Sequence, residues 1–244
     1  MFREIKKRQI ILENRKPYNK QISDYITELD KSDWICSSLR MNGSALTKTQ
    51  IEKMMKGEFI EDAPLSAHAL IEKYSRLFKT ARDMLQMSSS FNKDMLFTFA
   101  KILSEDDNIS YRRTNPVLVS LNYNPPHPSE IAEQVDLLMT WFYSDDMSTN
   151  PVRKAACLHH RIIEIYPFES ITEDVARSAM YYFLMEQGFH PFELNLGERE
   201  YNISITEYLK KENLEPFYNA VESSLFTKME IIVQLTKDKT PYHS

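Results

Sequence analysis

Glycine is scarce in this chain of 244 residues, which has only four. At the usual frequency of about 7%, a chain of this length would have about 17. A loop that holds a phosphate through closely approaching backbone amides needs several glycines in one short segment. Here no two of them share such a segment, which argues against a glycine-rich phosphate-binding loop. The four are Gly43, Gly57, Gly188 and Gly197.

Cysteine, basic charge and long apolar runs are also lacking. Cys36 and Cys157 are too few for a disulfide framework or a cysteine zinc site, which fits a reducing compartment. Lys and Arg total 30 against 35 Asp and Glu, so no basic excess exists to bind a nucleic acid backbone. The start of the chain does not resemble a signal peptide, and no run of about 18 apolar residues occurs. We therefore expect a cytoplasmic protein that binds neither nucleic acid nor membrane.

What the sequence does contain is helical periodicity along most of its length. Apolar residues recur at steps of three and four, which is typical of amphipathic helices packed on a core. The patterns run through residues 70–85, 131–142, 155–165 and 214–225, and another helix is expected after Ser170. With an N-terminal helix over residues 22–29, at least seven helices are predicted, and the fold class is all-α.

One segment departs from this pattern. Residues 109–126 combine β-branched and aromatic side chains with Asn and Pro, a composition typical of a short β-hairpin or an extended flap. We expect the exposed part of this flap to comprise Val117, Leu118, Val119, Ser120 and Leu121.

The segment that begins at Lys154 resembles the central motif of the Fic (Fic/Doc, Fido-domain) family. That motif typically reads A-A-x-L-H-x-x-F-x-x-I-H-P-F-x-[DE]-G-N-G-R-x-x-R. The positions that match it are Ala155, Ala156, Leu158, His159, Ile162, Ile165, Pro167, Phe168 and Arg177. The resemblance implies a helical bundle with a short β-hairpin flap. It divides the chain into an N-terminal helical segment over residues 1–62, a Fic core over residues 63–235 and a tail over residues 236–244.

The resemblance also implies a chemistry, and the motif departs from it. Family members usually transfer AMP from ATP, with magnesium, to a hydroxyl group of a target protein. Here Tyr166 stands at the position of the catalytic His, Ser170 at that of the metal-binding acid, and Asp174 at that of the first Arg. Ile171, Thr172 and Glu173 replace the Gly-Asn-Gly, so Arg177 is the polar residue that remains. We therefore expect no catalytic residue and no metal site at these positions, and no cofactor.

Two physical arguments support that expectation. A phenol with a pKa near 10 is about 0.1% ionised at pH 7, so Tyr166 is a poor general base compared with an imidazole. Glu173 and Asp174 place negative charge where a triphosphate would bind. The pattern from Ser170 to Glu173 also predicts a capping box, in which these side chains cap the following helix themselves.

A second segment resembles the family's inhibitory-helix motif, Ser-Ser-x-Ile-Glu-Gly-Asn. It consists of Ser37, Ser38, Leu39, Arg40, Met41, Asn42 and Gly43. In relatives the Glu of this motif pairs with the second motif Arg and blocks productive binding of ATP. Met41, or Asn42 if the one-residue insertion lies earlier, takes that position here, so we expect no ion pair with Arg177. The segment also reads as a plain helix that docks the N-terminal part.

Three alternatives remain open. His190, Pro191 and Phe192 form a true His-Pro-Phe, but their flanks place them after the post-motif helix. A divergent transferase would use ATP and Mg, with Arg177 as the anchor for its nucleotide and Glu169 or Glu173 as the metal ligand. The third is a regulatory partner of another Fic protein. The prediction is a degenerate Fic-domain protein without adenylyltransferase activity, which binds a partner polypeptide at the flap.

Overall fold

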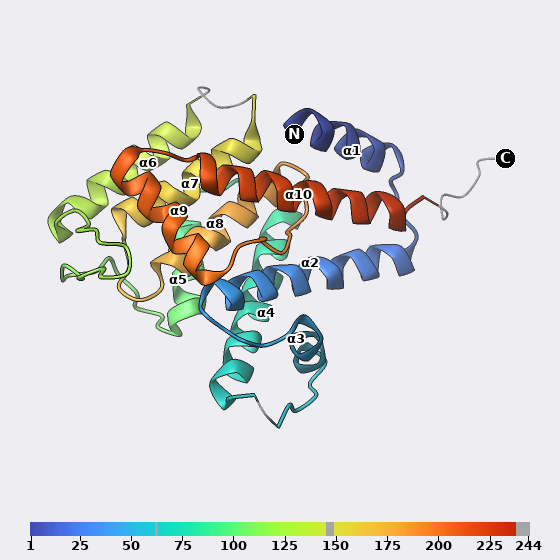
Figure 1. Cartoon of the computed structure of the whole chain (residues 1–244), viewed down its shortest axis with the longest axis horizontal. Helices are drawn as coiled ribbons and strands as arrows, with labels where there is room; N and C mark the ends of the chain where they lie inside the picture. Colours follow the sequence, from blue (N-terminus) through green and yellow to red (C-terminus); the bar gives the residue numbers. More distant parts are fainter. Residues whose placement is uncertain (62, 145–148, 238–244) are drawn as a thin grey trace.

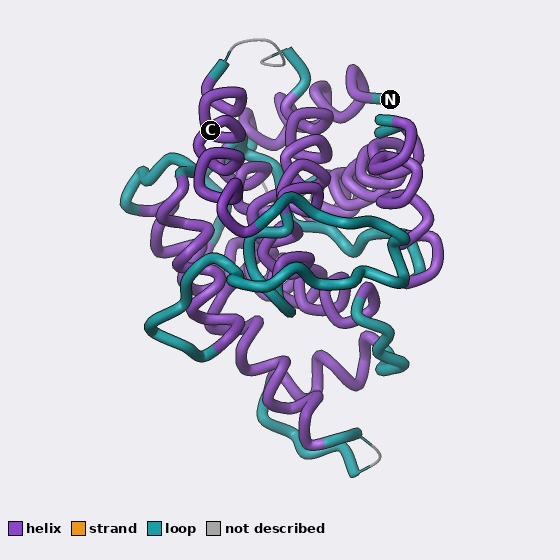
Figure 2. Tube along the Cα trace, turned by 90° about the vertical axis from the view of Figure 1, so that its left-hand side faces the viewer, coloured by secondary structure: helices purple, strands orange, loops and turns teal. Residues whose placement is uncertain are grey.

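The computed structural model describes residues 1–61, 63–144 and 149–237, and this part of the chain contains ten α-helices and no strand (Figure 1, Figure 2). The helices are α1 (Phe2–Asn14), α2 (Lys20–Met41), α3 (Lys48–Met55), α4 (Leu65–Gln86), α5 (Lys93–Ser104), α6 (Ile131–Tyr143), α7 (Pro151–Ile165), α8 (Thr172–Glu186), α9 (Glu198–Lys211) and α10 (Glu215–Leu235). The all-α prediction is confirmed. None of these helices combines the length and the apolar character that crossing a membrane would require.

Helix α8 forms the centre of the bundle. Its middle turns, residues 175–184, are buried on every face, as expected of a helix enclosed by others. Helix α7 packs along α8, while α2, α4 and α5 also contact it. The loop between α7 and α8 and the first turn of α8 are therefore fixed by the surrounding core.

Helices α2 and α10 run side by side (Figure 1) and are joined by buried charges. The Nζ of Lys228 on α10 lies 2.7 Å from Asp33 and 2.9 Å from Asp30, both on α2. Asp33 also accepts a hydrogen bond from Lys48, and Asp30 pairs with His190 at 2.8 Å. Burial by itself would raise the pKa of Asp30, but His190 and Lys228 hold it below its ordinary value. These pairs fix the position of α2, which carries the segment that resembles the inhibitory motif.

The predicted β-hairpin is wrong in detail. Within the described residues the flap has a single antiparallel bridge, between Leu118 and Tyr123, and no strand. The amides of Val119, Leu121 and Asn122 bond to carbonyls only two or three residues earlier, which makes consecutive turns instead of a ladder. Prolines on both sides of these turns have no amide hydrogen to offer a partner strand. The flap is consequently a looped segment with exposed apolar side chains at Val117 and Val119.

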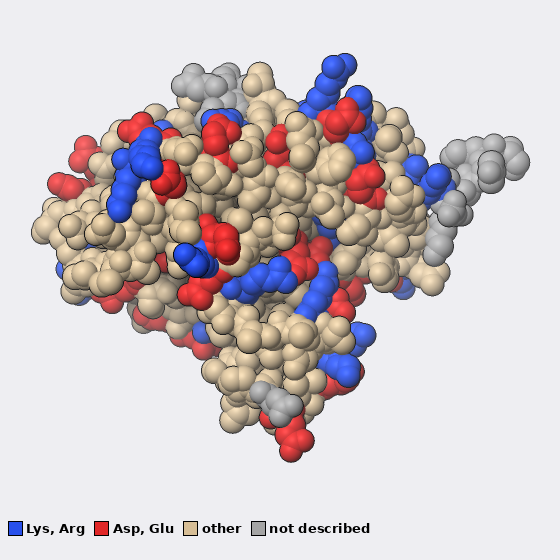
Figure 3. Space-filling model, in the orientation of Figure 1, with Lys and Arg blue, Asp and Glu red and all other residues tan. Residues whose placement is uncertain are grey.

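The proposed segment boundaries fall at residues 62 and 63 and at residues 235 and 236. Residue 62 and most of the tail, residues 238–244, lie outside the described residues. On the face shown in Figure 3, basic and acidic side chains are interspersed and no extended area has one sign.

The buried pairs of Lys228 lead to a test of stability. Lys228→Met removes the cation but leaves both aspartates buried, and removing one partner of such a pair costs about 3–5 kcal/mol. The free energy of unfolding, measured by urea denaturation, is expected to fall by that amount. Lys79→Met is the control, because Lys79 is exposed and pairs with Asp83 only on the surface of α4. Equal losses in the two variants would contradict a stabilising role of the buried network.

Candidate functional site

The loop between α7 and α8 is held by buried side chains. Tyr166 ends α7 in the left-handed region, with a φ of 49°, and its amide bonds to the carbonyl of Ile162. The Phe168 ring is fully buried and packs edge-on against Phe97, with ring centroids 5.5 Å apart. A bulky residue takes a positive φ only where its surroundings impose it, so the core sets the shape of this loop.

The predicted capping box at the start of α8 is wrong. Ile171 is the N-cap residue, no side chain caps this terminus, and Ser170 is exposed. Thr172 instead reaches back to Phe168: its hydroxyl donates to the carbonyl at 2.5 Å and accepts from the amide at 2.9 Å. The buried Thr172 and Phe168 thus define the turn from the core side, while the first amides of α8 have no side-chain cap.

Arg177 is buried and surrounded by partners from four helices. It forms an ion pair with Asp174, three residues earlier on α8. Its guanidinium also donates to the side-chain oxygen of Asn42 at 2.6 Å and to the hydroxyl of Tyr201 at 3.1 Å. Tyr74 donates to Asp174 at 2.6 Å, and Asn42 donates to the same carboxylate at 3.0 Å. The charge of Arg177 is therefore neutralised inside the protein.

The segment that resembles the inhibitory motif forms the last turns of α2 and reaches this network. Asn42, its C-cap residue, occupies the contact with Arg177 as a neutral side chain, so the expected absence of an ion pair from this segment agrees with the geometry. Ser37 lies deeper, where its hydroxyl oxygen accepts from Tyr181 at 2.8 Å. The remaining residues of the segment are Ser38 and Met41, which are buried, and Arg40, which is exposed and pairs with Glu193.

Acidic side chains lie close to the loop that precedes α8. Burial raises the pKa of Glu173, and the neighbouring Asp174 and Glu198 raise it further against the opposing effect of Arg177. Burial together with Glu173 and Asp174 raises the pKa of Tyr166 to about 12. The phenol of Tyr166 is thus protonated at neutral pH, and a smaller fraction of it is ionised and able to accept a proton than in an exposed tyrosine.

Glu198 also meets the end of α2. Gly43 has a φ of +78°, and a Cβ placed there would lie 2.8 Å from the carboxylate of Glu198. A side chain at position 43 would therefore be strained and would displace Glu198.

A chain of hydrogen bonds extends from Arg177 through two buried histidines. Tyr201 bonds to His159 at 2.8 Å, the Nδ1 atoms of His159 and His160 are 2.9 Å apart, and His160 bonds to the carbonyl of Ser204. Because a carbonyl only accepts, Nε2 of His160 carries its proton and its Nδ1 accepts from Nδ1 of His159. His159 then accepts from Tyr201, which accepts from Arg177. Each hydrogen bond in this series is therefore donated in the direction that leads from Arg177 toward Ser204.

Both histidines are neutral in this arrangement. Burial lowers the pKa of His159 well below its ordinary value, and His160 and Arg177 lower it further. Burial lowers the pKa of His160 to about 3. The phenyl ring of Phe217 stacks on both imidazoles, with ring centroids 4.4 Å apart. These residues are therefore packed core histidines.

Arg112 is a buried residue that the sequence analysis did not single out. Its Nε donates to the carbonyl of Tyr166 at 2.7 Å, and its other nitrogens donate to Thr114, Asn115 and Pro126. It therefore ties the base of the flap to the loop before α8. The sequence alone does not distinguish the buried Arg112 from the neighbouring exposed Arg113, because no periodic pattern or motif includes either residue.

The second His-Pro-Phe lies elsewhere. Phe192 is buried, and His190 contacts Asp30 in the middle of α2. Asn195 donates its amide to Ser224 on α10. These residues follow α8, so the structure does not bring them to the loop before it.

Few side chains near the site are arranged to hold a metal ion. Within the described ranges, no three His, Cys, Asp or Glu side chains converge to ligate a metal. Glu169 is exposed and accepts a hydrogen bond from Thr114, while Glu173 is half-buried in the first turn of α8. A magnesium ion here would have to rely on one carboxylate and on the phosphates of a ligand.

A profile of the Fic/DOC family matches residues 64–184. The protein adenylyltransferase Fic of Nematostella vectensis is 30% identical over 113 residues, which are 45% of this chain and 26% of that protein. The protein adenylyltransferase fic-1 of Caenorhabditis elegans is 23% identical over 130 residues, 52% of this chain and 26% of that protein. The chain therefore spans about a quarter of the length of these curated relatives.

Solved structures show the same fold along nearly the whole chain. A Fic domain containing signaling protein from Bacteroides thetaiotaomicron superposes with a TM-score of 0.77 at 18% identity, covering 98% of this chain and 99% of that one. A fragment of Fic-1 from C. elegans gives a TM-score of 0.77 at 16% identity, covering 96% and 72%. The fold expected from the motif is confirmed.

The buried histidines predict how stability depends on pH. Between pH 6.5 and about 3 the unfolded state binds protons at His159 and His160 that the folded state excludes, so stability falls as the pH falls. From pH 7 to pH 5 each histidine is expected to remove about 2 kcal/mol from the free energy of unfolding. Denaturant titrations at several pH values measure this loss. His160→Gln is expected to halve the loss and the exposed His127→Gln to keep it; an unchanged slope in His160→Gln would contradict this account.

Proposed function

The chain belongs to the Fic/DOC family, and from that premise we propose that it is a degenerate Fic-domain protein that transfers no AMP and serves as a protein-binding or regulatory module. The proposal rests on the state of Arg177. In an adenylyltransferase of this family the motif arginines neutralise nucleotide phosphates. In this chain Asp174 already neutralises the remaining arginine, Asn42 and Tyr201 accept from its terminal nitrogens, and its buried Nε has no acceptor among the described residues.

The reacting groups support the same proposal. Transfer of AMP to a hydroxyl needs a base near neutral pH, and Tyr166 has a pKa raised to about 12. The position of the metal-binding acid holds Ser170, which is exposed and has no negative charge. A triphosphate would also meet the carboxylates of Glu173 and Asp174, and Asp174 already pairs with Arg177.

One observation favours the divergent transferase. No side chain caps the start of α8, so its first amides and the positive end of the helix dipole remain open to an anion. Under this alternative Arg177 would exchange Asp174 for a phosphate and Glu173 would hold magnesium. That exchange would leave Asp174 buried beside a phosphate, which like-charge repulsion disfavours.

Nucleotide transfer is tested directly. The purified chain is incubated with labelled ATP, GTP or UTP, magnesium or manganese, and cell lysate. We expect no labelled protein above the signal of an Arg177→Ala variant, and no rise in melting temperature with any nucleotide, since a ligand of the folded state must stabilise it. A labelled band that disappears in Arg177→Ala would establish the divergent transferase.

A double variant separates the effect of Glu173 and Asp174 on nucleotide binding from the effect of Tyr166 and Ser170. Glu173→Gly with Asp174→Arg removes the negative charge and restores the family's residue types at both positions. We expect it still to bind ATP weakly in calorimetry, because Tyr166 and Ser170 remain. Tight binding by this variant would mean that the two acids alone prevent nucleotide binding.

The flap supports the binding part of the proposal. Val117 and Val119 are exposed apolar residues on a segment anchored at its base by Arg112 and by the buried Leu121. Extended partners bind such segments through main-chain hydrogen bonds, with apolar side chains adding contact area. This mode of binding requires no catalytic group, so it would survive the loss of the motif.

The backbone requirement can be tested at Val119. Val119→Pro removes the amide and with it the turn bond to the carbonyl of Val117, whereas Val119→Ala keeps both and removes only apolar area. Quantitative pull-down with mass spectrometry is expected to show a partner that is lost with Val119→Pro and retained in part with Val119→Ala. A second Fic protein among the captured proteins would support the regulatory reading, and identical capture by all three chains would exclude the flap as the binding segment.

A further inference from the structure

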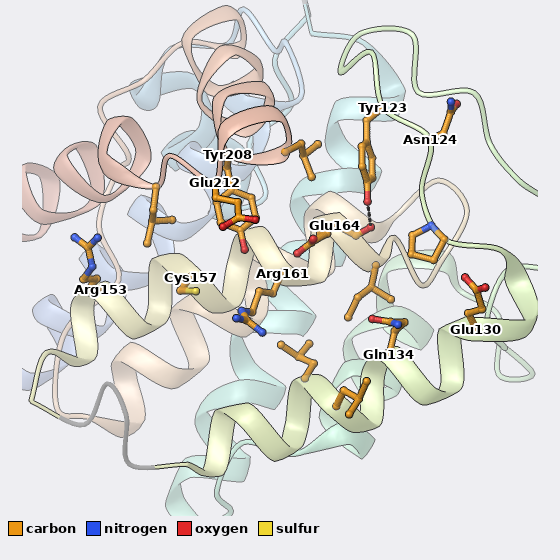
Figure 4. A pocket seen from close by; sticks show the side chains of 16 residues that line it. Tyr123, Asn124, Glu130, Gln134, Arg153, Cys157, Arg161, Glu164, Tyr208 and Glu212 are labelled. Carbon is orange, nitrogen blue, oxygen red and sulfur yellow. Dashed lines mark hydrogen bonds between the residues drawn. The ribbon is translucent and has the colours of Figure 1, made fainter.

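A large cavity is lined by residues outside the loop that precedes α8. It has a volume of about 740 Å³ and is enclosed by α6, α7, the end of α9 and the part of the flap around Tyr123 (Figure 4). This volume falls in the range of sites that hold ligands of several hundred daltons. The proposed function gives this cavity no role.

One wall is a charged stripe of α7. Arg153, Cys157 and Arg161 are spaced four residues apart and lie on one face of the helix, lining the cavity (Figure 4). Arg153 is already paired with Glu215 at 2.7 Å. Arg161 has no ion pair among the described residues, and its buried Nε has no hydrogen-bond acceptor there. Its guanidinium stacks on Trp141 at 4.3 Å, which holds it in place.

The next turn of the same stripe carries the opposite charge. Glu164 lines the cavity together with Glu212 from the end of α9. Burial raises the pKa of the Glu164 carboxyl; Arg161 opposes this shift and Glu212 adds to it. No ion pair joins Glu164 to Arg161 in the part of the chain that the structure describes. The guanidinium of Arg161, which has no ion pair among the described residues, therefore lies one turn from the carboxylate of Glu164, and Glu212 lines the same cavity.

The charges of Arg161, Glu164 and Glu212 determine which kind of ligand the cavity can bind. An anion alone would meet Glu164 and Glu212, and a cation alone would meet Arg161. A ligand with both charges satisfies all three groups. In an extended peptide, side chains two residues apart lie on the same side about 6.6 Å apart, a separation suited to groups on neighbouring turns of a helix. Leu137, exposed at the rim of the cavity, adds apolar contact.

We propose that this cavity binds a short extended peptide whose acidic side chain pairs with Arg161 and whose basic side chain lies between Glu164 and Glu212. The peptide would also contact the flap, because Tyr123 lines the cavity and donates to the carbonyl of Glu164 at 2.9 Å. The site is independent of the loop before α8 and of any nucleotide chemistry.

The indole signals of the two tryptophans provide the measurement. Trp141 lies under Arg161, while Trp34 is buried in the core against Phe78 and Tyr181 and acts as an internal reference. The probes are the blocked tripeptides acetyl-Lys-Ala-Glu-amide and acetyl-Glu-Ala-Lys-amide, the neutral acetyl-Gln-Ala-Gln-amide, and free lysine and glutamate. We expect at least one charged tripeptide to shift the Trp141 signal saturably, while the neutral tripeptide leaves it unchanged.

Variants assign the contacts. Arg161→Met keeps most of the side-chain volume and is expected to weaken binding of the charged tripeptide about tenfold, the effect of losing one charge-assisted hydrogen bond. Glu164→Gln is expected to weaken the same tripeptide and leave the fold intact, and the exposed Arg76→Met on α4 is the control. Absence of saturable binding, equal binding of the neutral tripeptide, or unchanged affinity in Arg161→Met would overturn the proposal. Equal affinity for free amino acids would replace the peptide by a small zwitterion and would also overturn it.

Discussion

The ion pair between Arg177 and Asp174 determines the character of the site. A buried guanidinium without a counter-charge would be strongly unfavourable, and here the counter-charge is one turn away on the same helix. That arrangement aligns Asn42 from α2, Tyr74 from α4 and Tyr201 from α9 around one helix. Arg177 is thereby held in an internal network, while the first amides of α8 have no side-chain cap.

The same network explains how the surrounding helices are positioned. Helix α2 reaches Arg177 through Asn42 at its end and reaches α10 through Asp30 and Asp33 in its middle. Arg112 connects the flap to the turn at Tyr166. The flap, α2 and α9 are thus all fixed relative to the start of α8, whether or not any ligand binds there.

Much of this could be predicted from the sequence, because helical periodicity and ordered motif positions are local signals. The all-α fold follows from such patterns. The hairpin and the capping box failed for a shared reason. Both patterns describe hydrogen bonds that the segment can make, but the burial of Phe168 and Thr172 and the prolines of the flap decided which ones form. Arg112 and the partners of Arg177 depend on contacts between distant segments, which no single-sequence pattern reports.

The directed bonds from Arg177 to Ser204 have a consequence for the interior as a whole. Reversing one donor would leave two hydrogens or two lone pairs facing each other at the next link, so no link can turn alone. These hydrogen bonds are therefore either all donated in the direction from Arg177 to Ser204, or the series is broken. The Ser204 carbonyl at the far end of the series can never donate, so only this direction exists. The hydrogen bonds inside α7, α8 and α9 therefore share one fixed direction, and the series adds no net charge beyond that of Arg177.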